Sequence, residues 1–85
     1  MPLRLRSDVV TTDTDDGMVL LDARSGRYWQ LNPTGAGVLR ALLAGQHPDH
    51  IAQDLATRYR IEYQQAHHDI TALIQRLHTA KLVSW

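Results

Sequence analysis

Five histidines and three serines are the first candidates for catalysis or metal binding in this 85-residue sequence, which has no cysteine. Without cysteine, thiolate metal sites and thiol nucleophiles are excluded. His47 and His50 are three residues apart and His67 and His68 are neighbours, so neither pair has the i, i+4 spacing of a helical zinc site. We therefore interpret the histidines as solvated surface residues and expect no metal site.

The serines do not favour catalysis either. Ser7, Ser25 and Ser84 fall in a terminal segment, in a predicted turn and among the last two residues. None has a histidine and a carboxylate arranged around it in the sequence as a nucleophilic triad requires. No glycine-rich loop with a lysine leads from a predicted strand into a helix, so a phosphate-binding loop is not expected. The prediction is a protein that is not an enzyme and has no cofactor.

Charge and length narrow the function further. Nine basic and nine acidic residues give a formal net charge of zero, whereas a protein that depends on phosphate contacts normally has a basic excess. We therefore expect no nucleic-acid partner. No secretory segment and no membrane-spanning apolar run are recognised, so we expect no membrane association and a cytoplasmic location. The length suits one small domain over residues 1–85.

The elements that would position a site begin with a predicted three-stranded meander. A short alternating segment at Leu3 and Leu5 is expected to be no more than a loose edge. The Asp-Gly pair at the end of the first turn is expected to supply the positive φ values of a tight hairpin. The predicted strands are Asp8–Thr12, Met18–Leu21 and Arg27–Leu31, joined by a turn at Thr14–Gly17 and a loop at Asp22–Gly26.

Three helices are predicted to follow. Asn32 is an N-cap in front of a proline, so the third strand should lead directly into a helix that runs from Pro33 to about Leu43 and ends at a left-handed Gly45. The second helix should start at Pro48 and place Ile51, Ala52, Leu55, Ala56 and Tyr59 on its inner side. The third should run from about Gln64 to Thr79, with the extended pair Leu82-Val83 packing behind it.

This order of elements predicts an α+β fold, a three-stranded antiparallel sheet followed by three helices, in a winged helix-turn-helix-like arrangement. Many proteins with that arrangement bind DNA. Here the outward side of the third helix carries a single arginine, Arg76, instead of a basic stripe. A DNA-binding regulator is therefore a distant alternative.

The third strand, Arg27–Leu31, is the predicted binding element. In a meander it lies at an edge, and it lacks the proline, lysine or inward charge that commonly protects an edge. Such an edge can accept an extended peptide as an added strand. The alternatives are that the chain's own N-terminus or a second copy covers it; we expect a monomer or at most a weak dimer. Trp29 and Leu31 should share one face, and Tyr28 and Gln30 the other.

Four stretches of the sequence form recognisable motifs: Asp16–Asp22, Ser25–Ala36, Ile51–Tyr59, and Asp69-Ile70 with Leu73 and Leu77. Together they resemble the PqqD family, over a span from about Val9 to Val83. The run Gly-Arg-Tyr-Trp-Gln-Leu-Asn-Pro-Thr-Gly is quite specific to that family. Lys81 departs from the pattern, because a glycine commonly closes the third helix, and this leaves the end of that helix open.

The resemblance implies a RiPP recognition element, a domain that binds the leader part of a ribosomally made precursor peptide and passes it to modifying enzymes. Within the family the sequence is similar to free-standing leader-binding proteins of lasso-peptide biosynthesis; the alternative is the chaperone of pyrroloquinoline quinone synthesis. The implied partners are the leader, a separate transglutaminase-like cysteine peptidase and an ATP-dependent macrolactam synthetase. The leader would lie antiparallel on the third strand, against the third helix. The implied leader-binding residues are Arg27, Tyr28, Trp29, Gln30 and Leu31 on the strand, and Asp69, Ala72, Leu73, Arg76 and Leu77 on the helix.

Overall fold

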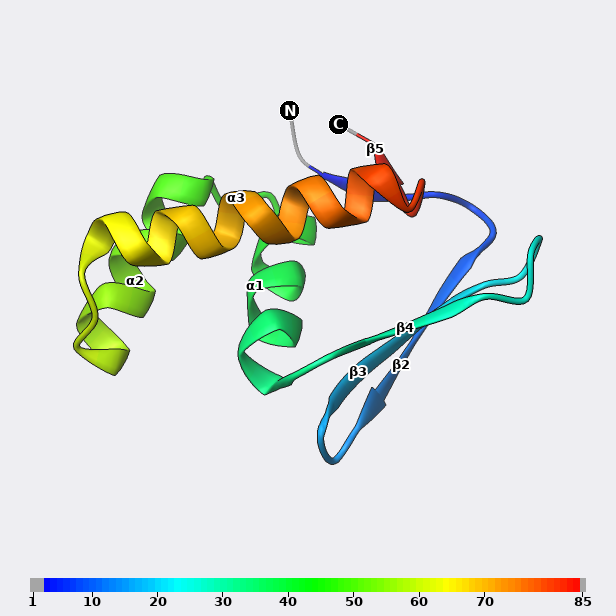
Figure 1. The fold of residues 1–85 in the computed structure, drawn as a ribbon, viewed down its shortest axis with the longest axis horizontal. Coiled ribbons are helices and arrows are strands. Elements are labelled where there is room, and N and C mark those ends of the chain that lie inside the picture. The colour runs from blue at the N-terminus through cyan, green and yellow to red at the C-terminus, as the bar shows by residue number, and fades with distance from the viewer. Residues whose placement is uncertain (1–2, 85) are drawn as a thin grey trace.

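Two of the three helices, the first and the last, lie against one side of a twisted antiparallel sheet, and the second helix packs on these helices away from the sheet (Figure 1). A second, very small sheet joins the two ends of the described chain. The computed structural model describes residues 3–84. The elements are β1 (Arg4–Leu5), β2 (Val9–Thr14), β3 (Gly17–Asp22), β4 (Tyr28–Leu31), α1 (Pro33–Leu43), α2 (Pro48–Tyr59), α3 (Tyr63–Thr79) and β5 (Val83–Ser84). The predicted α+β class and the order of the meander and the helices are confirmed.

The larger sheet has the order β2-β3-β4, so β4 lies at an edge. All its pairs are antiparallel, with Val10 opposite Leu21 and Leu21 opposite Tyr28. The strands are shifted by one or two residues from the predicted ranges, and Arg27 lies just before β4 instead of within it. The predicted edge strand is therefore confirmed, except that Arg27 belongs to the loop between β3 and β4.

The turn between β2 and β3 spans the predicted residues, Thr14–Gly17. Thr14 pairs with Gly17, so the two turn residues are Asp15 and Asp16. The positive φ, 135°, belongs to Gly17, the first residue of β3. A Cβ on Gly17 would overlap the carbonyl oxygen of Leu31 and lie 2.8 Å from the carbonyl carbon of Asn32. Glycine is thus required here for its positive φ, as predicted, and also because two backbone segments approach closely.

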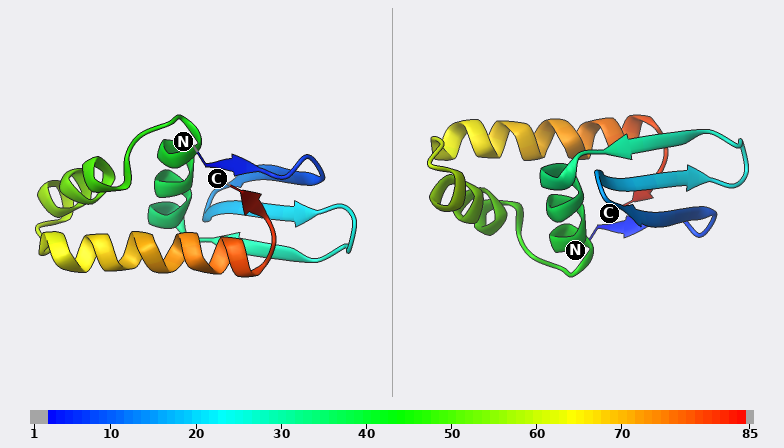
Figure 2. Two further views of the ribbon diagram at one scale, coloured as in Figure 1. Left: turned by 90° about the horizontal axis from the view of Figure 1, so that it is seen from above. Right: turned by 90° about the horizontal axis from the view of Figure 1, so that it is seen from below.

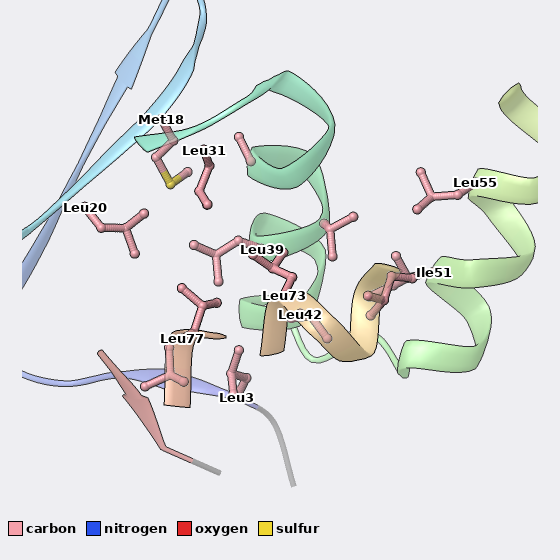
Figure 3. Close-up of a cluster of buried hydrophobic side chains, with 14 of the residues drawn as sticks. Leu3, Met18, Leu20, Leu31, Leu39, Leu42, Ile51, Leu55, Leu73 and Leu77 are labelled. Atoms are coloured by element: carbon pink, nitrogen blue, oxygen red, sulfur yellow. The ribbon is translucent and has the colours of Figure 1, made fainter. Parts of the chain in front are cut away.

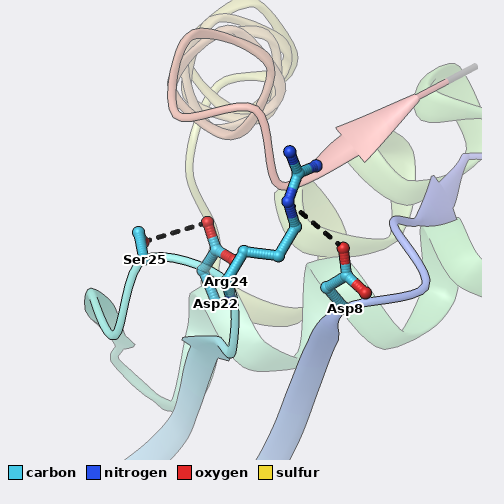
Figure 4. A network of polar contacts seen from close by, with 4 residues as sticks. All are labelled: Asp8, Asp22, Arg24 and Ser25. Atoms are coloured by element: carbon cyan, nitrogen blue, oxygen red, sulfur yellow. Dashed lines mark hydrogen bonds and ion pairs between the residues drawn. The ribbon is translucent and has the colours of Figure 1, made fainter.

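The loop between β3 and β4 is held by one carboxylate. Asp22 accepts a hydrogen bond from the Arg24 backbone N–H at 3.0 Å. It accepts a second one from the Ser25 hydroxyl at 3.1 Å (Figure 4). The bond from the Arg24 backbone is the main reason that the pKa of Asp22 lies below its ordinary value. Gly26 closes the loop with a φ of 75°, as predicted for this position.

The switch from β4 to α1 follows the predicted chemistry. The Asn32 side chain accepts a hydrogen bond from the Gly35 backbone N–H at 2.7 Å, and Pro33 occupies the first turn. The helix ends at Leu43, with Gly45 left-handed at φ 92°. α2 starts at Pro48 as predicted, and α3 starts one residue earlier than predicted, at Tyr63.

The hydrophobic core lies where α1 and α3 meet the inner face of the sheet (Figure 3). Leu20 and Leu39 are fully buried at its centre, between the sheet and α1. α2 closes the far end of the core with Ile51, Ala52 and Leu55. The described core has no buried polar or charged residue, so burial of apolar surface is its main source of stability.

The N-terminal segment is ordered differently from the prediction of a loose edge. Arg4 pairs with Ser84 and Leu5 with Val83, and Leu3 is only 1% exposed. The Arg6 backbone N–H also donates to the Leu82 carbonyl at 2.9 Å. β1 and β5 therefore order each other by pairing, although each is too short to be recognised as a strand from its sequence. α3 ends at Thr79, and Lys81 takes the left-handed φ of 61° that turns the chain into β5.

We predict that Gly17→Ala lowers the free energy of unfolding by about 2–4 kcal/mol, because the added methyl meets backbone atoms that cannot move freely. Gly26→Ala is the matched control, since its φ is also positive but its Cβ would meet nothing within 4 Å. We expect it to cost about 1 kcal/mol. Urea unfolding followed by circular dichroism measures both, and equal losses would contradict the close approach of Gly17 to Leu31.

Candidate functional site

The outer edge of β4 carries backbone groups that no described residue pairs with. The Asp22 backbone N–H donates to the Arg27 carbonyl at 2.9 Å, so these two residues form a hydrogen-bonded pair. Hydrogen-bonded pairs alternate along an antiparallel ladder, and the register therefore turns the N–H and C=O of Trp29 and Leu31 toward β3. The N–H and C=O of Tyr28 and Gln30 point to the free edge.

The chain's own N-terminus does not cover this edge, because β1 pairs with β5. That alternative is therefore wrong for the described residues. The side chains alternate as predicted: Leu31 is 7% exposed and Trp29 half-buried on the inner face, while Tyr28 is 68% exposed and Gln30 is exposed on the outer face. The inner face of the edge strand thus belongs to the core, and its outer face meets solvent.

α3 runs beside β4, and of the three strands β4 is the one nearest to it (Figure 2). Two neighbouring cavities lie along these elements, of about 600 and 510 Å3. They share Leu31, Leu73 and Arg76, and we call them together the β4–α3 groove. The larger is also lined by Arg27, Tyr28, Trp29 and Leu77, and the smaller by Gln30 and Asp69. Every predicted site residue except Ala72 lines the groove.

Two of the α3 residues have a second role. Leu73 and Leu77 are 8% and 3% exposed and belong to the core cluster, so they form the floor of the groove and also stabilise the fold. Asp69 accepts a hydrogen bond from the Gln65 side chain at 2.9 Å. Arg76 is exposed and has no ion-pair partner among residues 3–84. Ala72 is exposed beside the groove but does not line it.

The groove also includes residues that the sequence did not indicate. Gln75, Thr79 and Ala80 line it at the end of α3. At the other end it reaches Tyr59 and Ile61, which are 51% and 38% exposed. The prediction of Tyr59 on the inner side of α2 is thus wrong, because the helix ends there at a left-handed Arg60. The signal in the sequence that could have indicated this part of the groove is the pair of large side chains, Tyr59 and Ile61, on either side of the end of α2.

The described part of the chain offers no group of three or more histidine, aspartate or glutamate residues that could hold a metal. Two of the histidines instead contact the carboxylate of Asp49, at the start of α2. Nε2 of His67, on α3, lies 3.3 Å from it, and Nδ1 of His47, just before α2, lies 3.6 Å from it. Desolvation, followed by the charge of Asp49, raises the pKa of the neighbouring Tyr63. No helix of the described chain has the length and apolar character needed to cross a bilayer.

The family described as coenzyme PQQ synthesis protein D (PqqD) matches residues 17–83, which include the sheet edge, the groove and all three helices. The chain belongs to the PqqD family. No curated protein matches this PqqD-family chain.

Two solved structures share the fold. One, described as lasso peptide synthetase B1 complexed with the leader peptide, is 42% identical, with a TM-score of 0.94 over 100% of both chains. The other, TbiB1 in complex with the TbiA(beta) leader peptide, is 23% identical, with a TM-score of 0.84 over 95% of this chain and 94% of the other. The second likeness shows the fold alone.

We predict that Leu77→Ala lowers the free energy of unfolding by about 2–4 kcal/mol, because it leaves a cavity in the core. Arg76→Ala, one residue away on the same wall of the groove, should change it by no more than about 0.5 kcal/mol, since its side chain is exposed. Chemical unfolding of the two variants separates the groove residues that hold the fold from those available only to a ligand. A large loss for Arg76→Ala would show a structural role that its exposure does not predict.

Proposed function

We propose that this protein is a non-catalytic RiPP recognition element that binds the leader of a ribosomally synthesised precursor, a lasso-peptide precursor, as a strand added to β4. The observation that carries the proposal is the free edge of β4 beside the β4–α3 groove, in a fold that a 42% identical protein uses in a complex with a leader peptide. Main-chain bonds would supply affinity and the groove selectivity.

The chemistry of the edge suits an extended peptide. Tyr28 and Gln30 each offer one backbone donor and one acceptor, so a strand could form two hydrogen-bonded pairs there. Alternate side chains of that strand would face the groove, where Leu31, Leu73 and Leu77 offer apolar contacts. The remaining side chains would lie on the solvent side, in line with Tyr28. These contacts require no cofactor.

A bound leader has to reach the enzymes that process it. We infer that the complex presents it to a separate leader peptidase, a transglutaminase-like cysteine protease, and to an ATP-dependent macrolactam synthetase, in the cytoplasm where precursors are made. The second candidate within the family is the chaperone of pyrroloquinoline quinone synthesis, which the family's description favours. The genes next to this one distinguish them: a peptidase and an asparagine-synthetase-like ligase fit the lasso pathway, and a radical enzyme fits quinone synthesis.

We predict that Tyr28→Pro and Gln30→Pro weaken binding of the leader peptide of the 42% identical B1 protein by about 5–150-fold. Each removes an outward N–H and crowds an added strand, while the bonds to β3 use Trp29 and Leu31 and stay intact. Tyr28→Ala and Gln30→Ala should lose less, because the ladder is unchanged. Calorimetry measures the affinities, and circular dichroism first checks that each variant folds.

The matched control is Thr11→Pro on β2, the other edge of the same sheet. Val10 and Thr12 pair with β3 through their backbone groups, which turns the N–H of Thr11 outward. This variant should bind the leader as tightly as the parent. If it loses binding while the β4 variants keep theirs, the peptide adds to β2; if all three folded variants bind normally, strand addition is wrong.

A further inference from the structure

A third cavity, of about 520 Å3, continues from the β4–α3 groove around the start of β4. Arg27, Trp29 and Ala80 line both spaces, so a peptide that follows the edge past Arg27 arrives at this cavity. It lies between the β3–β4 loop, the segment after β1 and the turn between α3 and β5. We call it the basic cavity, because four cations line it: Arg6, Arg24, Arg27 and Lys81.

The two acidic residues of the same cavity, Asp8 and Asp22, balance only part of this positive charge. Asp8 lies 3.5 Å from the Arg24 guanidinium, and Asp22 accepts a hydrogen bond from the Ser25 hydroxyl (Figure 4). Asp22 also accepts a hydrogen bond from the Arg24 backbone N–H. The side chains of Arg6, Arg27 and Lys81 form no hydrogen bond or ion pair with any residue between 3 and 84. All three are exposed. Three unpaired like charges around one hollow favour an anionic ligand.

The opposite end of β4 has the opposite charge. Met18 pairs with Leu31, so the turn between β2 and β3 lies at the Leu31 end of the edge, and this turn carries Asp15 and Asp16. Neither is in an ion pair with a described residue. The edge therefore runs from a basic end at Arg27 to an acidic end at Leu31, although the chain as a whole has no net charge.

We propose that the basic cavity binds carboxylate side chains of the leader, in the segment that leaves the Arg27 end of β4. The inference rests on the proposed function, since it needs a peptide on this edge. Every strand pair of the sheet is antiparallel, and antiparallel addition continues that pattern. An antiparallel peptide runs from the acidic end to the basic end, so the carboxylates belong to the residues that follow its strand-adding segment, toward the part to be modified.

The test uses the shortest fragment of the B1 leader peptide that binds this protein, with both ends capped. Three glutamates or three glutamines are joined to its C-terminal end, and in a second pair to its N-terminal end. At low salt the C-terminal glutamates should bind about 3- to 10-fold more tightly than the glutamines, with the difference shrinking at high salt. At the N-terminal end glutamates should give no advantage, because they would meet Asp15 and Asp16.

Two variants locate the effect. Lys81→Glu should remove the advantage of the C-terminal glutamates. Arg60→Glu makes the same change of charge at an exposed residue with nearly the same backbone φ, 55° against 61°, at the end of α2 away from the cavity. It should leave the advantage in place, apart from a small general effect of net charge.

Three results would overturn the inference: equal binding of the two C-terminal peptides, an advantage at the N-terminal end instead, or an advantage that survives Lys81→Glu. Equal binding would leave leader capture intact, since the glutamine peptides still bind. If no peptide binds, the proposed function fails and this inference fails with it.

Discussion

The contact between the first residue of β3 and the last residue of β4 fixes the path of the edge strand. Gly17 has no Cβ, so its backbone can approach the Leu31 carbonyl closely. Leu31 fills the core, and Asn32 then caps α1. The end of β4, the core and the start of α1 therefore meet at Leu31 and Asn32. This packing fixes the position of the β4 edge. A ligand that binds there loses little of its binding energy to ordering the protein.

The sheet has two edges, and their backbone groups are chemically alike. Their surroundings differ, because α3 and its leucines lie beside β4, whereas β2 beyond Val9 is exposed along its whole length. The helix therefore decides which edge can recognise side chains. Its own position depends on Leu73 and Leu77, which serve the core and the groove at once. In the proposed complex, ligand selectivity and fold stability would therefore be coupled in this wall of the groove, and exposed residues such as Arg76 could vary without loss of stability.

The sequence was informative where the signal is local. The Asn32-Pro33 cap, the loop at Asp22–Gly26 and the periodicity of α3 each depend on neighbouring residues, and each is found in the structure. It was uninformative where partners lie far apart in the chain. β1 and β5 have two residues each, too few for a pattern, and pair only because the fold brings them together. The basic cavity likewise collects four cations from three separate segments, which a net charge of zero conceals. The close approach of Gly17 to Leu31 was also not predictable, because the two residues belong to different strands.

The pairing of β1 with β5 brings the two ends of the chain to one corner of the molecule. Arg4 lies opposite Ser84, and Arg6 and Lys81, next to these strands, line the basic cavity. A catalytic domain joined to either end through a short linker would therefore be held beside the same end of the edge strand. Such a tether gives an effective concentration of roughly millimolar. A fused enzyme could act on a peptide that is held only weakly, whereas a separate enzyme needs a docking interface of its own.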